Sequence, residues 1–114
     1  MSAEWRVRDA VTADAAALVA FNVAMARETE DRELAPERVG RGVARALADP
    51  RRGRYLIAVD EHDEPAGSLL LTDEWSDWRN GAFWWIQSVY VRPEVRQQGV
   101  FAALWSRVRD DARA

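Results

Sequence analysis

The sequence predicts an α+β fold: one strand, two helices, a three-stranded antiparallel meander and a final helix, in a single domain over residues 1–114. Three observations lead to this prediction. The chain is 48% hydrophobic and 31% charged, as expected of one globular domain with its own core. Apolar residues recur at helical spacing in the first half and again near the C-terminus. The middle consists instead of short apolar runs separated by polar turns, which is typical of strands.

The first half of the chain accounts for the first strand and both early helices. Residues 5–8 alternate between apolar and charged side chains, which indicates a short strand. Thr12 is a good helix N-cap, so we expect a helix over residues 13–27. Pro36 suits the first turn of a second helix, and the Asp49-Pro50 pair ends it.

The second half contains the meander and the last helix. Its apolar runs, Tyr55–Val59, Gly67–Thr72 and Ala82–Val91, predict three strands. Asn80-Gly81 is a strong signal for a two-residue hairpin between the last two of them. From Val100 to Ala112 the apolar spacing is helical again.

The third strand of the meander is apolar on both faces. Arg92-Pro93 ends it, because proline cannot join a ladder of hydrogen bonds. A strand that is apolar on both sides is expected in the centre of a sheet, covered on both faces. Strict alternation places one set of side chains on a common face, namely Phe83, Trp85, Gln87, Val89 and Val91.

Composition excludes several classes of function. With no cysteine and one histidine, His62, the chain has no disulfide, cysteine nucleophile or thiolate metal site, and we expect no metal centre. A net charge of −3 does not favour a nucleic-acid or membrane-surface partner. No apolar run reaches membrane-spanning length, and the expected location is cytoplasmic.

The segment from Val89 to Trp105 is a strand, a polar loop containing Gly99 and the start of a helix. The first amides of a helix are free to bind phosphate, and glycine lets the backbone approach a ligand. Arg96-Gln97-Gln98-Gly99-Val100-Phe101 resembles motif A of the GCN5-related N-acetyltransferases (GNAT), in which Arg or Gln is followed after two residues by Gly. The order of elements is similar to that of the same family.

The resemblance implies a transferase that moves an acetyl group from acetyl-CoA to a primary amine of a small molecule or peptide. Acetyl-CoA would pair with the backbone of Val89 and Val91 as an added strand, and the Val89 amide would polarise the thioester carbonyl. The CoA pyrophosphate would lie on the loop and the helix start. This expected cofactor-binding loop consists of Arg96, Gln97, Gln98, Gly99, Val100, Phe101 and Ala102.

Two residues depart from the family pattern. Some members have a glutamate that helps to deprotonate the amine where this chain has Gln87, and glutamine cannot act as a base. We therefore expect Gln87 to orient water or the acceptor. Phe101 stands where the motif prefers a small residue, so its ring must turn away from the phosphates.

The proton acceptor and the acceptor pocket must then come from other acidic residues. Glu74 is the candidate base, and Glu28, Trp75 and Asp77 are candidate contacts to a cationic amine. The alternative is that these acids are ordinary solvated surface groups.

The tryptophans between Trp75 and Trp85 could also stack nucleic-acid bases. We favour core packing and a pocket wall for them, because the neighbouring acids would repel phosphates.

The resemblance spans the whole chain but only the front part of the family's fold, because the later strands are absent from these 114 residues. We therefore expect an incomplete domain, which a homodimer partner or another chain supplying those strands would complete. The alternative function is a non-catalytic acyl-CoA-binding or protein-interaction domain.

Overall fold

The computed structural model describes residues 5–113 and confirms the α+β architecture. The expected domain also includes residues 1–4 and 114, which lie outside the described residues. The described chain forms one antiparallel sheet in the order β1-β2-β3-β4, with helices on both of its faces. The elements are β1 (Arg6–Asp9), a 3-10 turn (Thr12–Asp14), α1 (Ala15–Glu30), α2 (Pro36–Ala48), β2 (Arg54–Val59), β3 (Pro65–Ser76), β4 (Gly81–Val91), a second 3-10 turn (Pro93–Val95) and α3 (Val100–Arg113).

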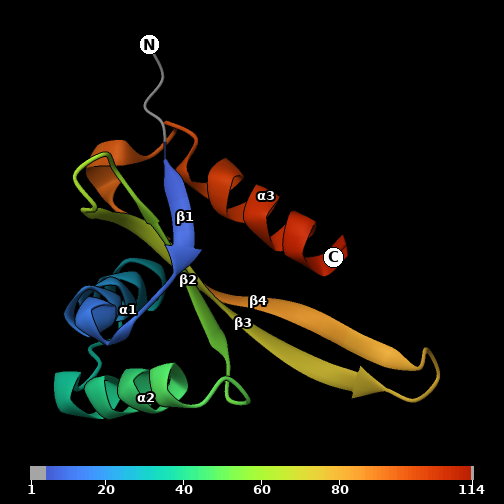
Figure 1. The fold of residues 1–114 in the computed structure, drawn as a ribbon. Coiled ribbons are helices and arrows are strands. Elements are labelled where there is room, and N and C mark those ends of the chain that lie inside the picture. Colours follow the sequence, from blue (N-terminus) through green and yellow to red (C-terminus); the bar gives the residue numbers. More distant parts are fainter. Residues whose placement is uncertain (1–4, 114) are drawn as a thin grey trace.

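The sheet separates two apolar layers (Figure 1). α3 packs on one face, where its Val100, Leu104 and Val108 join buried residues of β2 and β3. α1 and α2 cover the other face, where Leu18 and Val43 pack with Tyr55 of β2. All residues of β2 after its first are buried, so β2 is the strand covered on both sides. Within residues 5–113, no helix is both long and apolar enough to cross a membrane.

The position expected for the third strand of the meander is wrong. That strand is β4, and in the described residues it pairs only with β3, so it lies at the edge of the sheet. The distal part of the β3–β4 hairpin extends beyond all three helices (Figure 1). No layer of the described structure covers its aromatic side chains, and the expected core packing of these residues does not occur. The exposed aromatic residues of the hairpin are Trp75, Trp78, Phe83, Trp84 and Trp85.

The connection between β3 and β4 also differs from the two-residue turn expected at Asn80-Gly81. Ser76 pairs with Gly81, so the loop consists of residues 77–80. Asn80 takes the left-handed conformation, with φ of +50°. Asparagine tolerates this conformation better than most residues. The Asn80-Gly81 pair therefore predicted the position of the turn correctly but not its length.

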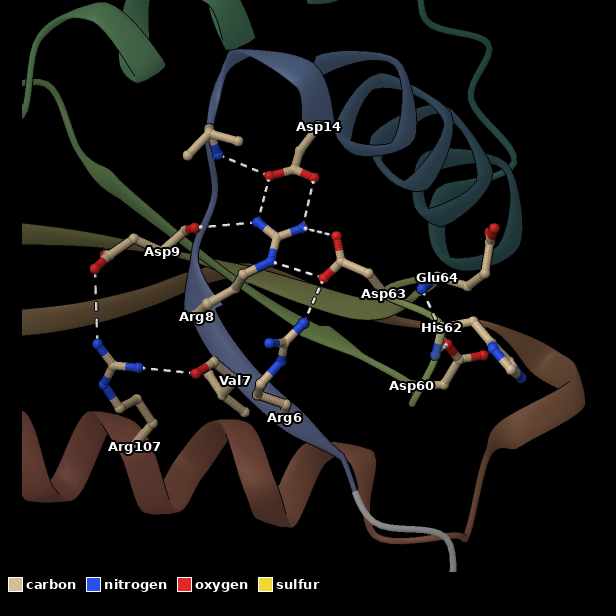
Figure 2. Close-up of polar contacts among 11 residues, drawn as sticks. Arg6, Val7, Arg8, Asp9, Asp14, Asp60, His62, Asp63, Glu64 and Arg107 are labelled. Atoms are coloured by element: carbon tan, nitrogen blue, oxygen red, sulfur yellow. Dashed lines mark hydrogen bonds and ion pairs between the residues drawn. The ribbon is translucent and has the colours of Figure 1, made fainter.

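The first helix begins with a 3-10 turn rather than with the expected Thr12 cap. Asp14 supplies the side-chain contact instead, because its carboxylate accepts a hydrogen bond from the Val11 amide at 2.7 Å. Arg8 of β1 holds the same carboxylate with both of its terminal nitrogens, at 2.8 and 3.0 Å (Figure 2). Asp63 lies on the other side of Arg8, at 3.2 Å from Nε. The contact between Arg8 and Asp14 joins β1 to the start of α1.

We expect Asp14→Ala to lower the free energy of unfolding by about 1–3 kcal/mol, because Asp14 is buried and its loss leaves the Val11 amide without its acceptor and removes two hydrogen bonds of Arg8, which keeps its contact with Asp63. The Arg8 hydrogen bonds hold the pKa of Asp14 below its ordinary value of 3.8. Its ionised form therefore stabilises the fold above pH 3.8, and this contribution is lost as the pH falls through the lower folded-state pKa. Urea unfolding at several pH values measures both effects.

Asp110→Asn is the matched control, since that carboxylate is exposed and only 4.0 Å from its neighbour Arg109. It should change stability by no more than about 0.5 kcal/mol. An Asp14→Ala protein as stable as this control at pH 7 would contradict the assigned role.

Candidate functional site

The loop between β4 and α3 has the backbone of an anion-binding turn. Gln97 and Gly99 have φ of +66° and +88°, so the chain reverses sharply just before α3. The Ala103 amide donates to the Gly99 carbonyl at 3.0 Å, which opens the helical hydrogen-bond ladder. The amides of Val100, Phe101 and Ala102 precede that bond and lie at the positive end of the helix dipole. They can therefore donate to an anion.

A cavity of about 450 Å³ lies against this loop. It has the size of a small-molecule site. α1 contributes one wall and the end of β4 contributes another. The lining residues are Met25, Glu28, Thr29, Val89, Tyr90, Val91, Arg96, Gln97, Gly99, Val100, Phe101 and Ala102. The structure thus brings together all the expected loop residues except Gln98, together with Val89, Val91 and Glu28.

A β-bulge at Ser88 shapes the strand beside this cavity. Leu70 pairs with Gln87, but Ser68 pairs with Tyr90, so β4 holds one extra residue there. Ser88 has φ of +51°. The bulge overturns the strict alternation expected along β4. Val89 and Val91 pack with the α3 layer, and they do not share the face of Gln87.

The free edge of β4 presents the backbone of Val89 and Val91. The Arg92 amide donates to the Ala66 carbonyl of β3 at 2.9 Å, so it points into the sheet. Backbone groups of an antiparallel strand alternate in direction, and those of Val91 and Val89 therefore point to the other edge. The Val91 carbonyl confirms this direction, since it accepts from Arg96 Nε of the loop at 2.9 Å.

The Arg96 side chain is already engaged on its own protein. Its Nη2 donates to Glu28 Oε1 at 2.8 Å, and its guanidinium lies 5.4 Å from the centre of the Tyr90 ring. The Arg96 hydrogen bond lowers the pKa of Glu28, whereas burial raises the pKa of Tyr90. Sequence reasoning assigned Glu28 to the acceptor and did not foresee this contact.

The other expected site residues do not line the cavity. Gln87 donates to Thr72 Oγ1 at 2.6 Å on the face of the sheet covered by α1 and α2. Glu74 pairs with Phe83, six residues before Val89, which is about 20 Å along a strand. Trp75 pairs with Ala82 still farther along the hairpin, and Asp77 lies in its end loop. None of Glu74, Trp75 and Asp77 lines the cavity.

Two residues of the expected cofactor-binding loop, Gln98 and Phe101, differ in their relation to the cavity. The Gln98 side chain turns away from the cavity and donates to the Glu94 carbonyl at 3.3 Å, while its own carbonyl accepts from Trp5 Nε1 at 2.8 Å. Phe101 lines the cavity and remains 47% exposed.

Comparisons with known proteins agree with this geometry. The family model described as "Acetyltransferase (GNAT) family" matches residues 18–114. A possible acetyltransferase from Clostridium difficile 630 is 39% identical, with a TM-score of 0.87; the match covers 93% of this chain and 69% of that chain. No protein with curated function matches.

Two further solved structures share the fold at lower identity. A probable acetyltransferase is 24% identical, with a TM-score of 0.84, and the match covers 95% of this chain and 71% of that one. A predicted acetyltransferase from Clostridium acetobutylicum, solved with acetyl-CoA, is 20% identical, with a TM-score of 0.74. That match covers 96% of this chain and 74% of the other.

Proposed function

The chain belongs to the GNAT acetyltransferase family, and from that premise we propose that it transfers the acetyl group of acetyl-CoA to a primary amine of a small molecule or peptide. The observation that carries this proposal is the cavity between the free edge of β4 and the amides that start α3. The reaction needs a supply of acetyl-CoA, and the proposal includes a cytoplasmic location. It includes neither a nucleic-acid nor a membrane partner.

The donor side of the reaction follows from the backbone. The amides of Val100, Phe101 and Ala102 would receive the CoA pyrophosphate, because they are unpaired within the helix and lie at its positive end. The outward backbone groups of Val89 and the Val91 amide would pair with the pantetheine arm, since the Val91 carbonyl already accepts from Arg96 Nε. The Val89 amide would then donate to the thioester oxygen and stabilise the negative charge that develops there.

The acceptor side requires a free amine beside that thioester. The amine nitrogen attacks the carbonyl carbon, the carbon–sulfur bond breaks, the CoA thiolate leaves, and the amine loses a proton to water or a base. Gln87 does not line the cavity, and its hydrogen bond to Thr72 Oγ1 holds it on the face of the sheet covered by α1 and α2. It would orient an amine or a water molecule that approaches the β4 edge from that face, and it would take no proton, because its amide group is not basic at neutral pH.

A second candidate function is a non-catalytic acyl-CoA-binding or protein-interaction domain. The exposed aromatic side chains of the β3–β4 hairpin favour it, because so many large apolar side chains left open on one hairpin are typical of an interaction site. Trp78 is 96% exposed and Trp75 is 66% exposed. A second copy of the chain, or a chain that adds strands to the free edge of β4, would cover this surface.

Turnover of acetyl-CoA with a panel of primary amines distinguishes the two functions. We expect amine-dependent release of CoA thiol, which a thiol reagent can follow without background because the chain contains no cysteine. Gln87→Ala should lower kcat roughly 10-fold or more while leaving the CoA dissociation constant unchanged. Hydrolysis without amine is the control.

The two alternative outcomes have separate meanings. CoA binding by calorimetry without turnover of any amine, together with self-association in sedimentation experiments, would favour the interaction domain. Absence of any CoA binding would reject both forms of the proposal.

A further inference from the structure

Arg96 connects the anion-binding loop to two other elements. Its Nε donates to the Val91 carbonyl of β4 at 2.9 Å, and its Nη2 donates to Glu28 of α1 at 2.8 Å. Its guanidinium also lies over the Tyr90 ring, 5.4 Å from the ring centre. Three groups therefore hold one long side chain that would otherwise sample many rotamers.

The α1 side of this contact is itself well anchored. Tyr90 is buried and packs against Phe21, with ring centres 5.3 Å apart. Phe21 and Glu28 are seven residues apart, so they lie on the same face of α1. The helix thus presents an apolar contact and a carboxylate together to the end of β4.

The loop that follows Arg96 needs such support. Gln97 is a non-glycine residue with φ of +66°, a conformation that persists only where the surroundings impose it. Binding through backbone amides depends on their being oriented before the ligand arrives. Arg96 directly precedes this turn, and its side chain is held by β4 and α1.

We propose that Glu28 is a positioning residue, which acts through Arg96 to hold the loop of residues 96–99 in the conformation that receives the CoA pyrophosphate. This inference rests on the proposed function. The ion pair contributes little by itself to the free energy of unfolding, since the side chains of Arg96 and Glu28 are 44% and 38% exposed. The role of the ion pair is to orient the loop. This favourable effect on CoA binding is larger than the repulsion between the Glu28 carboxylate and the bound phosphates.

A double-mutant cycle tests this inference by calorimetric titration with CoA. Glu28→Gln should weaken CoA binding roughly 2- to 5-fold, because glutamine keeps an acceptor oxygen but loses the charge that holds the guanidinium. In an Arg96→Gln background the same change should weaken binding no further. Glu33→Gln is the matched control, since Glu33 forms an exposed 3.4 Å pair with Arg27 and does not line the cavity.

Hydrogen exchange without ligand provides a second measurement that does not depend on CoA. In Glu28→Gln the amides of residues 97–102 should exchange several-fold faster, while thermal unfolding matches that of the Glu33 control. Unchanged exchange, tighter CoA binding or equal losses in both backgrounds would overturn the role of Glu28. If the parent chain binds no CoA, the proposed function fails, and the exchange result still decides whether Glu28 orders the loop.

Discussion

Gly67→Val is expected to lower the free energy of unfolding by about 3 kcal/mol, because the side chain has no space to occupy. A Cβ atom at Gly67 would lie 2.7 Å from the Tyr90 carbonyl oxygen, 3.0 Å from Val100 Cγ1 and 3.3 Å from Val91 Cα. Two of these three atoms belong to the backbone of β4, which cannot yield without separating from β3. Denaturant unfolding followed by tryptophan fluorescence measures the loss.

The same substitution should also disturb the candidate site, because Gly67 pairs with Val91. Gly42→Ala is the matched control: it lies in α2 with nothing within 4 Å of its Cβ position. Alanine is the better helix former, so this variant should be more stable than the parent by up to about 1 kcal/mol. A Gly67→Val protein with the stability of the parent would show that β3 and β4 tolerate separation at this point.

The sequence predicted the type and order of the elements because their signals are local. Helical spacing identified α1, α2 and α3, and prolines at positions 36, 50 and 93 marked where elements begin or end. The boundaries differ by a few residues where a local signal competes with a tertiary contact. Asp14 illustrates this: it replaces Thr12 at the helix start because Arg8 of β1 lies close enough to bind it.

The bulge at Ser88 could not be predicted from the pattern. Alternation along β4 assumes one residue on β3 for each residue on β4, and the extra residue breaks that count. Serine gives no particular signal for a positive φ. The consequence for the site is large, because the bulge separates Gln87 from Val89 and Val91, which lie on opposite faces of the sheet.

The aromatic residues of β4 show a second feature of the fold that the sequence pattern could not predict, namely what covers them. Their pattern shows that both faces of the strand are apolar, but it does not show what covers them. Residues such as Trp84 and Trp85 remain 41% and 52% exposed in the described structure. Coverage depends on the length of the hairpin relative to the helices, which is a property of the whole fold.

The sequence indicated the candidate site most directly where it depends on the backbone of a contiguous segment. Gly99 and the helix after it indicated the loop, and the cavity lies there. The contact between Glu28 and Arg96 joins residues 68 positions apart, so no local pattern could report it. Glu74 and Asp77 were proposed from their charge alone, and the structure places both along the hairpin, away from the cavity.

Gly99→Val is expected to weaken CoA binding by about 1–3 kcal/mol, or roughly 5- to 150-fold in the dissociation constant. Gly99 has φ of +88°, which a β-branched residue strongly disfavours. A Cβ atom there would meet nothing within 4 Å, so the cost is backbone strain and not a steric clash. The loop can relieve that strain only by changing the direction of the amides that follow. Calorimetric titration with CoA measures the loss.

Gly81→Val provides the control for this substitution, because Gly81 lies at the end of the hairpin, has no positive φ and has only the Arg79 carbonyl oxygen, at 3.8 Å, near its Cβ position. Its CoA affinity should equal that of the parent. Gly99→Ala should fall between the parent and Gly99→Val, because alanine is disfavoured at this φ but less so than a β-branched residue. Equal CoA affinity for Gly99→Val and the parent would mean that the amides at the start of α3 do not hold the pyrophosphate, and the donor site would then have to lie elsewhere along β4.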